Sequence, residues 1–471
     1  MKKILIPMMF LLCSQQALAM DTPAIIWTKY FYESSYAKFY DVHETSDGGF
    51  IVAGAHLPLS GGASQTSIYR FSTDGDLLWT SGGDGYTGQS GYWVEELSDG
   101  SFIAAGGCGI PDAPTQGMLL LKTDSEGNQI WSKCFDLPDS DETGYCVLPL
   151  EDGGFAVCGE LYPMPSGSGY SSSIIIKTDS LGNSLWTTTL DLPRSNSGRR
   201  VVQIDNYLVV YVSGYSSGTT RLIWLSPEDG EILHEASDFP LSFGSIFFSG
   251  DMTVSSTDEG FTFVTSYFPQ IAHTDETGNL LWYLEIPYWS QPFGYSINNT
   301  MDGGYIYGGE NTPGEEPPWG IQTGMVVKFD SEGIEQWRDY VYETHDVQSI
   351  RQLSSGGYIA CGGCGIGTLI RYEPETGIDE NQIEIVSSLS APSPNPFSSS
   401  LNIQFNLDQT SVIELSVYDL SGRLIEILEQ DSFQEGEHSF DWTPGNLSSG
   451  CYLIRLSTPQ ESFVRNCVFL E

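Results

Sequence analysis

The amino-acid sequence is short of basic residues and of histidine. Lysine and arginine together number 19 against 61 aspartates and glutamates, which gives the 471 residues a formal net charge of -42 at pH 7. Such a surface repels phosphate backbones and anionic membranes, so we expect no nucleic-acid partner. The 6 histidines show no H-E-x-x-H or other zinc-ligand spacing, and we expect no metal and no other cofactor.

Long apolar runs are also missing. Beyond its start the chain has no apolar stretch of about 18 residues, so we expect no transmembrane segment in the mature protein. Lys2 and Lys3 precede a short apolar stretch at 4–12 and an Ala-Leu-Ala motif that ends at Ala19. Residues 1–19 therefore predict a secretory signal peptide that is cleaved after Ala19. Cys13 follows a bulky leucine, which is unlike the cysteine of a lipoprotein signal.

Charged residues make up only 17% of the chain, which argues against disorder caused by charge repulsion. The 52 glycines and the aromatic share of 13% indicate an all-β protein with many tight turns. Hydrophobic residues reach 40%, enough to fill a large core, and the length allows two or three domains.

One phrase recurs through most of the chain, at intervals of roughly 53 residues apart from one shorter interval. Its copies are SDGGFIVAG from residue 46, SDGSFIAAG from 98, EDGGFAVCG from 151, IDNYLVVYVSG from 204, DEGFTFV from 258, MDGGYIYGG from 301 and SSGGYIACG from 354. A second phrase, Asp-x-x-Gly followed by a short strand, runs in step with it and ends in Trp79, Trp131, Trp186, Trp282 and Trp337.

Each repeat unit contains about four short strands, and a four-stranded repeat of about 40–50 residues is typical of a β-propeller. The sequence therefore predicts a seven-bladed β-propeller over residues 25–380. The last unit stops at Gly377 without a tryptophan strand, whereas residues 25–30 carry an unpartnered one. We predict that the strand around Trp27 completes the last blade, because closure removes exposed edges.

The turns inside both phrases have a local cause. Aspartate hydrogen-bonds its own backbone in a tight turn, and glycine supplies a positive φ. Asp47, Asp99, Asp152 and Asp302 are therefore predicted to be structural. A calcium site is the alternative, but the alternating acids of an EF-hand loop are absent.

The repeat pattern is lost after residue 380. A linker is expected at 381–392, where a proline-rich stretch begins, and six short strand patterns follow. They predict a small β-sandwich over residues 393–471.

This region resembles the C-terminal sorting domain of type IX secretion substrates, which is related to the immunoglobulin-like (Ig-like) domain of flagellar hook-capping proteins. The matching pieces are SPNPF at 393–397, VYDLSGRLIEIL at 417–428, GEHSFDW at 436–442 and LSSGCYLIRL at 447–456. The resemblance implies the type IX secretion machinery as a partner, and a secreted or outer-membrane surface location reached through the periplasm. The repeats resemble the DGGF-type repeats found upstream of such domains, which implies no activity.

Two motifs of enzyme sites occur without the structure that such sites need. A G-x-S-x-G sequence contains Ser216, but it lies between β-strands, whereas the nucleophile elbow joins a strand to a helix. A G-x-G-x-x-G sequence at 83–88 is not followed by a helix that would hold a pyrophosphate. We therefore predict no catalytic residue, although distant carboxylates of a propeller can still converge.

The cysteines favour structural roles. Cys361 and Cys364 form a C-x-x-C motif at the end of a strand, unlike redox motifs, which begin a helix. Alignment of the repeats places Cys158 opposite Cys361 and Cys108 opposite Cys364, at positions that we interpret as buried.

Eight cysteines remain after the signal peptide, an even number that permits disulfides in an exported protein. Cys451 and Cys467 are departures from the family pattern. Each is eight residues from Pro459, so a hairpin centred there places them directly opposite and facing outward. This spacing predicts a disulfide between them.

The loops between repeats are long on one face of the propeller, opposite the short Asp-Gly turns. Long loops on a rigid scaffold are typical of binding sites. They contain aromatic residues that suit sugar rings or a protein partner, namely Tyr86, Tyr162, Tyr288, Trp289 and Trp319. The alternative is that these rings only cover the edges of the blades.

Two function classes follow. The first is an exported, non-catalytic binding protein whose loop face takes a glycan or another surface protein. The second is a propeller enzyme that acts on extracellular polysaccharide. Acids that recur in every blade should serve the blade, whereas a catalytic acid should break the repeat.

Overall fold

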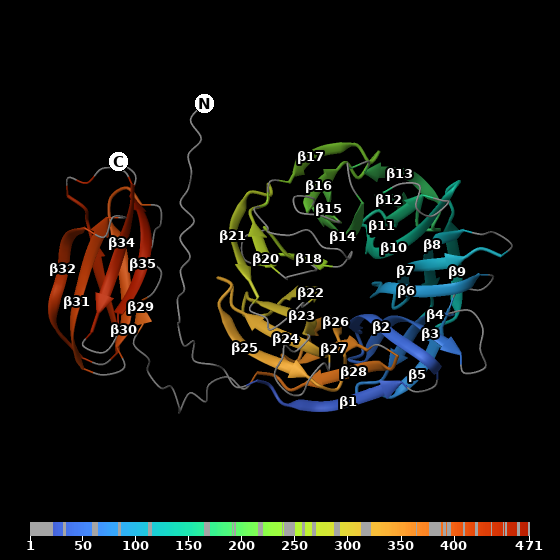
Figure 1. Ribbon diagram of the computed structural model, residues 1–471, viewed down its shortest axis with the longest axis horizontal. Helices are drawn as coiled ribbons and strands as arrows, with labels where there is room; N and C mark the ends of the chain where they lie inside the picture. Colours follow the sequence, from blue (N-terminus) through green and yellow to red (C-terminus); the bar gives the residue numbers. More distant parts are fainter. Residues whose placement is uncertain are drawn as a thin grey trace. The chain divides into compact units, whose positions relative to one another are not determined.

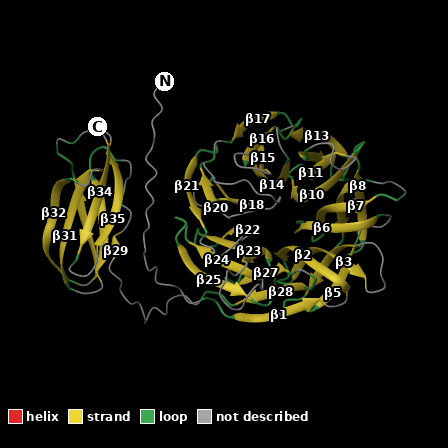
Figure 2. Cartoon of the chain, in the orientation of Figure 1, coloured by secondary structure: helices red, strands yellow, loops and turns green. Residues whose placement is uncertain are grey.

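The computed structural model describes residues 22–31, 34–58, 65–82, 86–111, 115–163, 170–190, 192, 195–214, 220–237, 239, 250–256, 260–265, 270–286, 293–311, 322–363, 365–375, 388–389, 392, 397–407, 410–419, 423–434, 436–445, 447, 450–458 and 462–469. The chain divides into two compact units, Met1–Glu375 and Thr376–Glu471. All regular structure in these residues is β (Figure 2), as predicted, and none of them belongs to a helix that could cross a membrane.

The described part of the first unit forms seven four-stranded antiparallel sheets, arranged in a ring (Figure 1). Six sheets, here called blades, use four consecutive strands. They are β2(Ser34–Glu44) to β5(Leu77–Ser81) with β3(Phe50–Pro58) and β4(Gln65–Phe71); β6(Thr87–Glu96), β7(Phe102–Gly109), β8(Gln116–Thr123) and β9(Gln129–Phe135); β10(Ser140–Pro149), β11(Phe155–Pro163), β12(Ser172–Thr178) and β13(Ser184–Leu190); β14(Asn196–Ile204), β15(Tyr207–Gly214), β16(Arg221–Leu225) and β17(Ile232–Ala236); β18(Gly250–Val254), β19(Phe261–Thr265), β20(Gln270–Thr274) and β21(Leu280–Glu285); and β22(Phe293–Asn299), β23(Tyr305–Asn311), β24(Thr323–Phe329) and β25(Glu335–Val341).

The last blade joins the two ends of this unit. Its strands β26(Val347–Gln352), β27(Tyr358–Gly362) and β28(Gly367–Tyr372) are completed by β1(Ile25–Phe31), in which Trp27 pairs with Arg371. The predicted role of the Trp27 strand is therefore confirmed. The first strands of neighbouring blades contact one another around the ring, β26 and β2 included. The β-propeller class is confirmed, and the described residues hold one sheet for each copy of the repeated phrase.

The tryptophan of one copy of the second repeated phrase lies against the glycine of the copy in the next blade. Gly127 has a φ of 85°, and a Cβ atom there would lie 2.6 Å from the ring of Trp79 in the preceding blade. Gly182 stands in the same way 2.8 Å from Trp131. Only glycine combines this backbone conformation with such a close approach. The phrase therefore holds one blade against the next.

The aspartates of the DGG turns are structural, as predicted. Asp152 accepts a hydrogen bond from the backbone N–H of Gly154 and pairs with Lys177 of its own blade at 2.7 Å. Asp302 pairs with Lys328 at 2.7 Å in the same arrangement. Equivalent pairs join Arg70 to Asp47 and Lys122 to Asp99.

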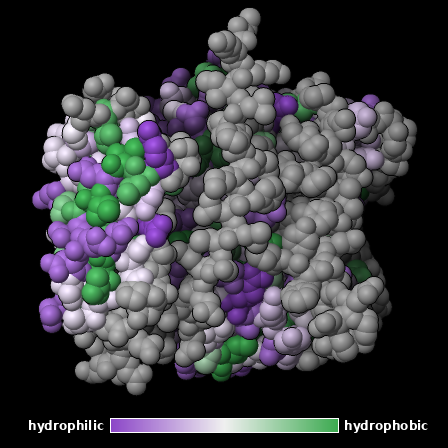
Figure 3. Space-filling model, turned by 60° about the vertical axis from the view of Figure 1, so that its left-hand side comes forward, coloured by the Kyte–Doolittle hydropathy of each residue, from purple (hydrophilic) through white to green (hydrophobic). Residues whose placement is uncertain are grey.

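The second unit consists of two sheets around one apolar core. One sheet contains β29(Ser388–Leu389), β30(Leu401–Leu407) and β33(Gly436–Trp442); the other contains β32(Leu424–Phe433), β31(Ser411–Asp419), β34(Gly450–Ser457) and β35(Ser462–Phe469). Phe397 of the SPNPF motif packs against Trp442 and Phe469, with ring centroids 5.6 and 5.2 Å apart. Figure 3 shows one face of the molecule, on which small hydrophobic patches lie among hydrophilic side chains. The Ig-like topology of this unit stays a prediction.

The register of the last hairpin corrects the geometry on which the Cys451–Cys467 disulfide was predicted. Tyr452 lies opposite Cys467, and Cys451 pairs with Val468. Because Ser457 pairs with Ser462, the loop has an even number of residues and its centre falls beside Pro459, not on it. Cys467 is buried in the core and does not face outward. The disulfide stays a prediction, now without its geometric argument.

A disulfide that the sequence did not predict joins Cys108 to Cys134 in the second blade. The two residues lie on β7 and β9, on either side of β8, with Cα atoms 6.3 Å apart. The bond passes over Gly117 of β8, where a Cβ atom would lie 2.6 Å from the sulfur of Cys134. A glycine in the middle strand therefore makes room for this cross-link.

Candidate functional site

The inner strands of six blades carry a β-bulge at the same point. The register shifts by one residue between Phe39 and Asp41 and, at equivalent positions, between Gly91 and Trp93. A bulge leaves one residue unpaired and re-aims its side chain. The unpaired residues are Tyr40, Tyr92, Tyr145, Arg199, Tyr295 and Gln348. In the fifth blade β18 has no register shift and begins at Gly250.

These six bulge residues and Gly250 line a cavity of ≈ 330 Å³ in the centre of the ring. The remaining lining residues are Lys38, Asp41, Trp93, Asp251, Ser296 and Ser349. Each of them lies at least three residues before the end of its inner strand, and these strands start from the loops between blades and end at the short turns. The cavity is therefore on the long-loop side of the channel.

Tyrosine rings form a continuous wall along three neighbouring blades. The ring centroids of Tyr40 and Tyr92 are 4.6 Å apart, and those of Tyr92 and Tyr145 are 5.2 Å apart. The guanidinium of Arg199 lies 3.9 Å from the centre of the Tyr145 ring and continues the wall. Burial raises the pKa of all three phenols, so their hydroxyl groups stay neutral.

Two of the tyrosines are held by glutamates of the second strand. The Tyr145 hydroxyl donates to Glu160 at 3.2 Å, and the Tyr295 hydroxyl donates to Glu310 at 3.0 Å. Burial raises the pKa of both carboxyl groups. The same pair thus recurs in the third and sixth blades and fixes the orientation of each ring.

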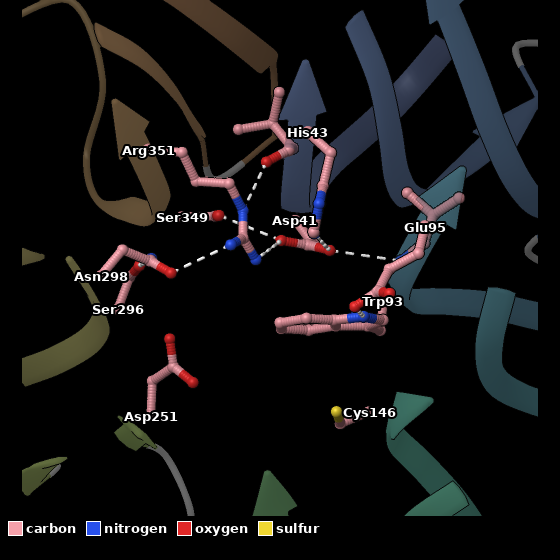
Figure 4. Close-up of polar contacts among 12 residues, drawn as sticks. Asp41, His43, Trp93, Glu95, Cys146, Asp251, Ser296, Asn298, Ser349 and Arg351 are labelled. Atoms are coloured by element: carbon pink, nitrogen blue, oxygen red, sulfur yellow. Dashed lines mark hydrogen bonds and ion pairs between the residues drawn. The ribbon is translucent and has the colours of Figure 1, made fainter. Parts of the chain in front are cut away.

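Asp41 is the centre of a polar network at the floor of the cavity (Figure 4). It accepts hydrogen bonds from Ser349 at 3.1 Å and from Arg351 at 3.3 Å, and its other oxygen lies 3.1 Å from His43. Arg351 also donates to Asn298 at 2.9 Å. Burial acts to raise the pKa of Asp41, but His43 and Arg351 outweigh it and hold that pKa well below its usual range.

The floor residues also connect each blade to the next. Asp41 accepts the backbone N–H of Val94, and Asp251 accepts that of Ile297. Ser296 accepts the N–H of Ile350 in the same way. An acid at this position of the inner strand breaks the repeat, but its hydrogen bonds serve to join neighbouring blades. The geometry gives both floor carboxylates a structural role.

A second cavity of ≈ 640 Å³ lies on the short-turn side of this floor. Arg200, Arg351 and His43 line it together with Glu95 and residues of the DGG turns. Its rim is held by blade contacts, since Glu96 accepts the N–H of Ser46. The floor thus separates two cavities with different linings.

The sequence-predicted binding residues are only partly within the described structure. Tyr162, at the end of β11, is 36% exposed, and Tyr86 packs against the buried cluster of the first two blades. Tyr288, Trp289 and Trp319 lie outside the described residues, as do Ser216 and the predicted cleavage site at Ala19. Among the residues that the structure covers, no three metal-ligating side chains converge.

The bulge residues were not predicted, because they lie outside the repeated turn phrases on which the predicted fold rests. Their signal is a Gly-Tyr dipeptide a few residues before the DGG turn, as in GYW at 91–93, GYC at 144–146 and GYS at 294–296. Arg199 follows Gly198 at the same position.

Comparison with known protein families identifies the second unit. Residues 393–469 match the secretion system C-terminal sorting domain. No curated relative matches the sequence.

Solved structures of similar shape include the WD40 β-propeller domain of Doa1, with 14% identity, a TM-score of 0.48 and coverage of 74% of this chain and 97% of that one. A DUF4221-family protein from Bacteroides vulgatus has 7% identity, a TM-score of 0.37 and coverage of 75% and 98%. PorZ, a surface component of the type IX secretion system of Porphyromonas gingivalis, has 11% identity, a TM-score of 0.24 and coverage of 92% and 81%.

The sorting domain and the ring of blades together identify the chain as a type IX secretion substrate with a β-propeller body, exported to the medium or the cell surface.

Proposed function

We propose that the exported propeller is a non-catalytic binding protein that takes part of a hydroxyl-rich glycan into the channel cavity on its long-loop side. The observation that carries this proposal is the wall of contacting tyrosine rings, Tyr40, Tyr92 and Tyr145, which continues into Arg199. Aromatic faces pack against the C–H groups of sugar rings, and neutral phenols donate and accept hydrogen bonds with sugar hydroxyls.

The size of the cavity fits such a ligand. Its ≈ 330 Å³ lies at the lower end of the volumes of small-molecule sites, which are about 300–1,000 Å³. The predicted aromatic residues of the long loops, Trp289 and Trp319, would extend the site for a longer chain. Their contribution stays a prediction.

Binding is favoured over catalysis by the bonds that the acids make. Asp41 and Asp251 accept backbone N–H groups of the next blade, and Asp41 is ion-paired. Both carboxylates are therefore engaged in structural bonds, although burial raises the pKa of Asp251. The alternative, an enzyme acting on polysaccharide, rests on Glu160 and Glu310, whose raised pKa values are those of candidate acids.

The test is a glycan array with the exported protein, followed by calorimetric titration of the glycans that bind. Tyr92→Ala should weaken binding about 10- to 100-fold, because the central ring of the wall is lost. The matched control is Tyr207→Ala, which removes a 42% exposed tyrosine beside a short turn and should leave binding unchanged. Equal losses in the two variants contradict the proposed site, and release of shorter glycans during incubation supports the enzyme instead.

A further inference from the structure

Two cysteines of the third blade face each other. Cys146 on β10 and Cys158 on β11 are direct partners in the antiparallel register, and both are buried, with exposed fractions of 1% and 0%. Directly opposite residues have Cα atoms about 4.5–5.5 Å apart. Disulfides span Cα distances of about 4.4–6.8 Å, so this pair is within reach of a bond.

The two thiols already interact. They hydrogen-bond to each other, and the Nη1 atom of Arg200 lies 3.9 Å from the sulfur of Cys146. Burial raises the pKa of Cys158 well above its usual range. Burial acts on Cys146 in the same direction, but the Cys158 hydrogen bond and Arg200 outweigh it and lower its pKa. In the folded blade Cys146 is therefore the more acidic of the two thiols.

The route of export exposes these thiols to oxidation. The chain passes through the periplasm, where disulfides form and persist. The neighbouring blade already contains the Cys108–Cys134 bond. Cys361, the equivalent of Cys158 in the last blade, pairs with Ser349 and Leu369 and has no sulfur opposite it.

We propose that Cys146 and Cys158 are oxidised to a second disulfide while the propeller folds in the periplasm. One of the two cysteine thiolates attacks a disulfide of a protein thiol oxidant, forms a mixed disulfide and releases one oxidant thiolate. The other cysteine thiolate then attacks the cysteine sulfur of the mixed disulfide and displaces the second oxidant thiolate. The two cysteines lose two protons and two electrons, and the oxidant disulfide is reduced to a dithiol. Because both sulfurs are buried in the finished blade, the exchange precedes its packing against β14.

The bond would sit directly behind the candidate binding site, a consequence that rests on the proposed function. Tyr145 precedes Cys146, and Glu160, which accepts the Tyr145 hydroxyl, is two residues after Cys158. A covalent link between β10 and β11 therefore fixes the two strands that present this pair.

The test uses the full-length exported protein, denatured without reductant in the presence of an alkylating agent. Peptides are then mapped by mass spectrometry after cleavage at acidic residues, since no lysine or arginine separates Cys134, Cys146 and Cys158. We expect a linked pair of peptides containing Cys146 and Cys158, with Cys108–Cys134 linked and Cys361 alkylated as internal references. Alkylation of Cys146 and Cys158 to the same extent as Cys361 overturns the proposal, whether or not the protein binds a glycan.

A second measurement tests the effect of the bond. Cys158→Ser should lower the melting temperature by on the order of 5 °C without reductant, and reductant added during unfolding should remove the difference between variant and wild type. The matched control is Cys361→Ser, whose difference in melting temperature from wild type should be the same with and without reductant. A difference between Cys158→Ser and wild type that persists in full with reductant contradicts the proposal, because it reflects packing alone.

Discussion

The short turns of the propeller and its inner strands follow opposite rules. In the turns the same residue types return in blade after blade, as in the pairs Asp152–Lys177 and Asp302–Lys328. In the inner strands the residue after each bulge changes, from Asp41 to Trp93 to Cys146. The repeated turn residues therefore hold the blades, whereas a residue that varies after the bulge is not one that every blade requires. Asp41 shows the limit of this rule, because it varies and is still structural.

The largest loss of stability is expected for a substitution of Asp41 itself. Asp41→Asn keeps an acceptor for only one of Val94 and Ser349, which bond different oxygens of Asp41, and leaves the largely buried Arg351 guanidinium without its carboxylate. We expect the free energy of unfolding to fall by about 3–5 kcal/mol, measured by denaturant titration. Asp251→Asn is the control and should cost less, because its nearest cation, Arg200, is 3.9 Å away. A fully stable Asp41→Asn protein would contradict the structural role and make Asp41 a candidate for ligand binding.

A smaller loss is expected where a repeated glycine meets a tryptophan. Gly182→Val puts a side chain at a φ of 75° against Trp131, and we expect a loss of about 2–4 kcal/mol with unchanged affinity in the folded fraction. Gly100→Ala is the control, because Gly100 has a φ of 77° but nothing within 4 Å of an added Cβ. It should cost only about 1 kcal/mol, the strain of the backbone alone. Similar losses in both variants would show that conformation, and not the Trp contact, explains the repeat.

A residue on the long-loop side of the propeller should make the stability of the fold depend on pH. Glu142, at the start of β10, is fully buried and accepts hydrogen bonds from Ser140 and from the N–H of Leu137. Burial raises its pKa to about 7, so the folded state binds the proton more tightly than the unfolded state. The stability it contributes is complete below its unfolded pKa and is lost as the pH rises through 7. Between about pH 5 and 8 we expect a fall of about 1–2 kcal/mol that Glu142→Gln does not show.

The smallest effect concerns one repeated ion pair. Lys177→Met removes the partner of Asp152, whose carboxylate is half exposed, so the loss should be about 0.5–1 kcal/mol and should shrink in high salt. Thermal unfolding at low and high salt measures it. A loss that salt does not change would mean that Lys177 acts through its bond to the Pro227 carbonyl of the next blade.

Much of the fold could be predicted because the turn residues and the tryptophans recur at a fixed spacing in the sequence. The strand around Trp27 was placed from its missing partner alone. The candidate site was harder to predict, because a β-bulge adds one residue whose type is not fixed. Arg199 replaces the tyrosine in one blade. The Cys108–Cys134 bond crosses a middle strand, so no hairpin arithmetic reveals it. The spacing argument used for Cys451 and Cys467, with the hairpin centred on Asp152 in place of Pro459, identifies Cys146 and Cys158 as directly opposite residues.

The pairing of β1 with β28 sets the order of events during export. Residues 25–31 enter the periplasm first and wait there until residues 367–372 have followed, because only then does the last blade have its fourth strand. Contacts so distant in sequence form slowly. Until they form, both ends of the ring present unpaired strand edges, which favour aggregation. The ring of this chain therefore keeps two open strand edges for as long as its two ends are apart.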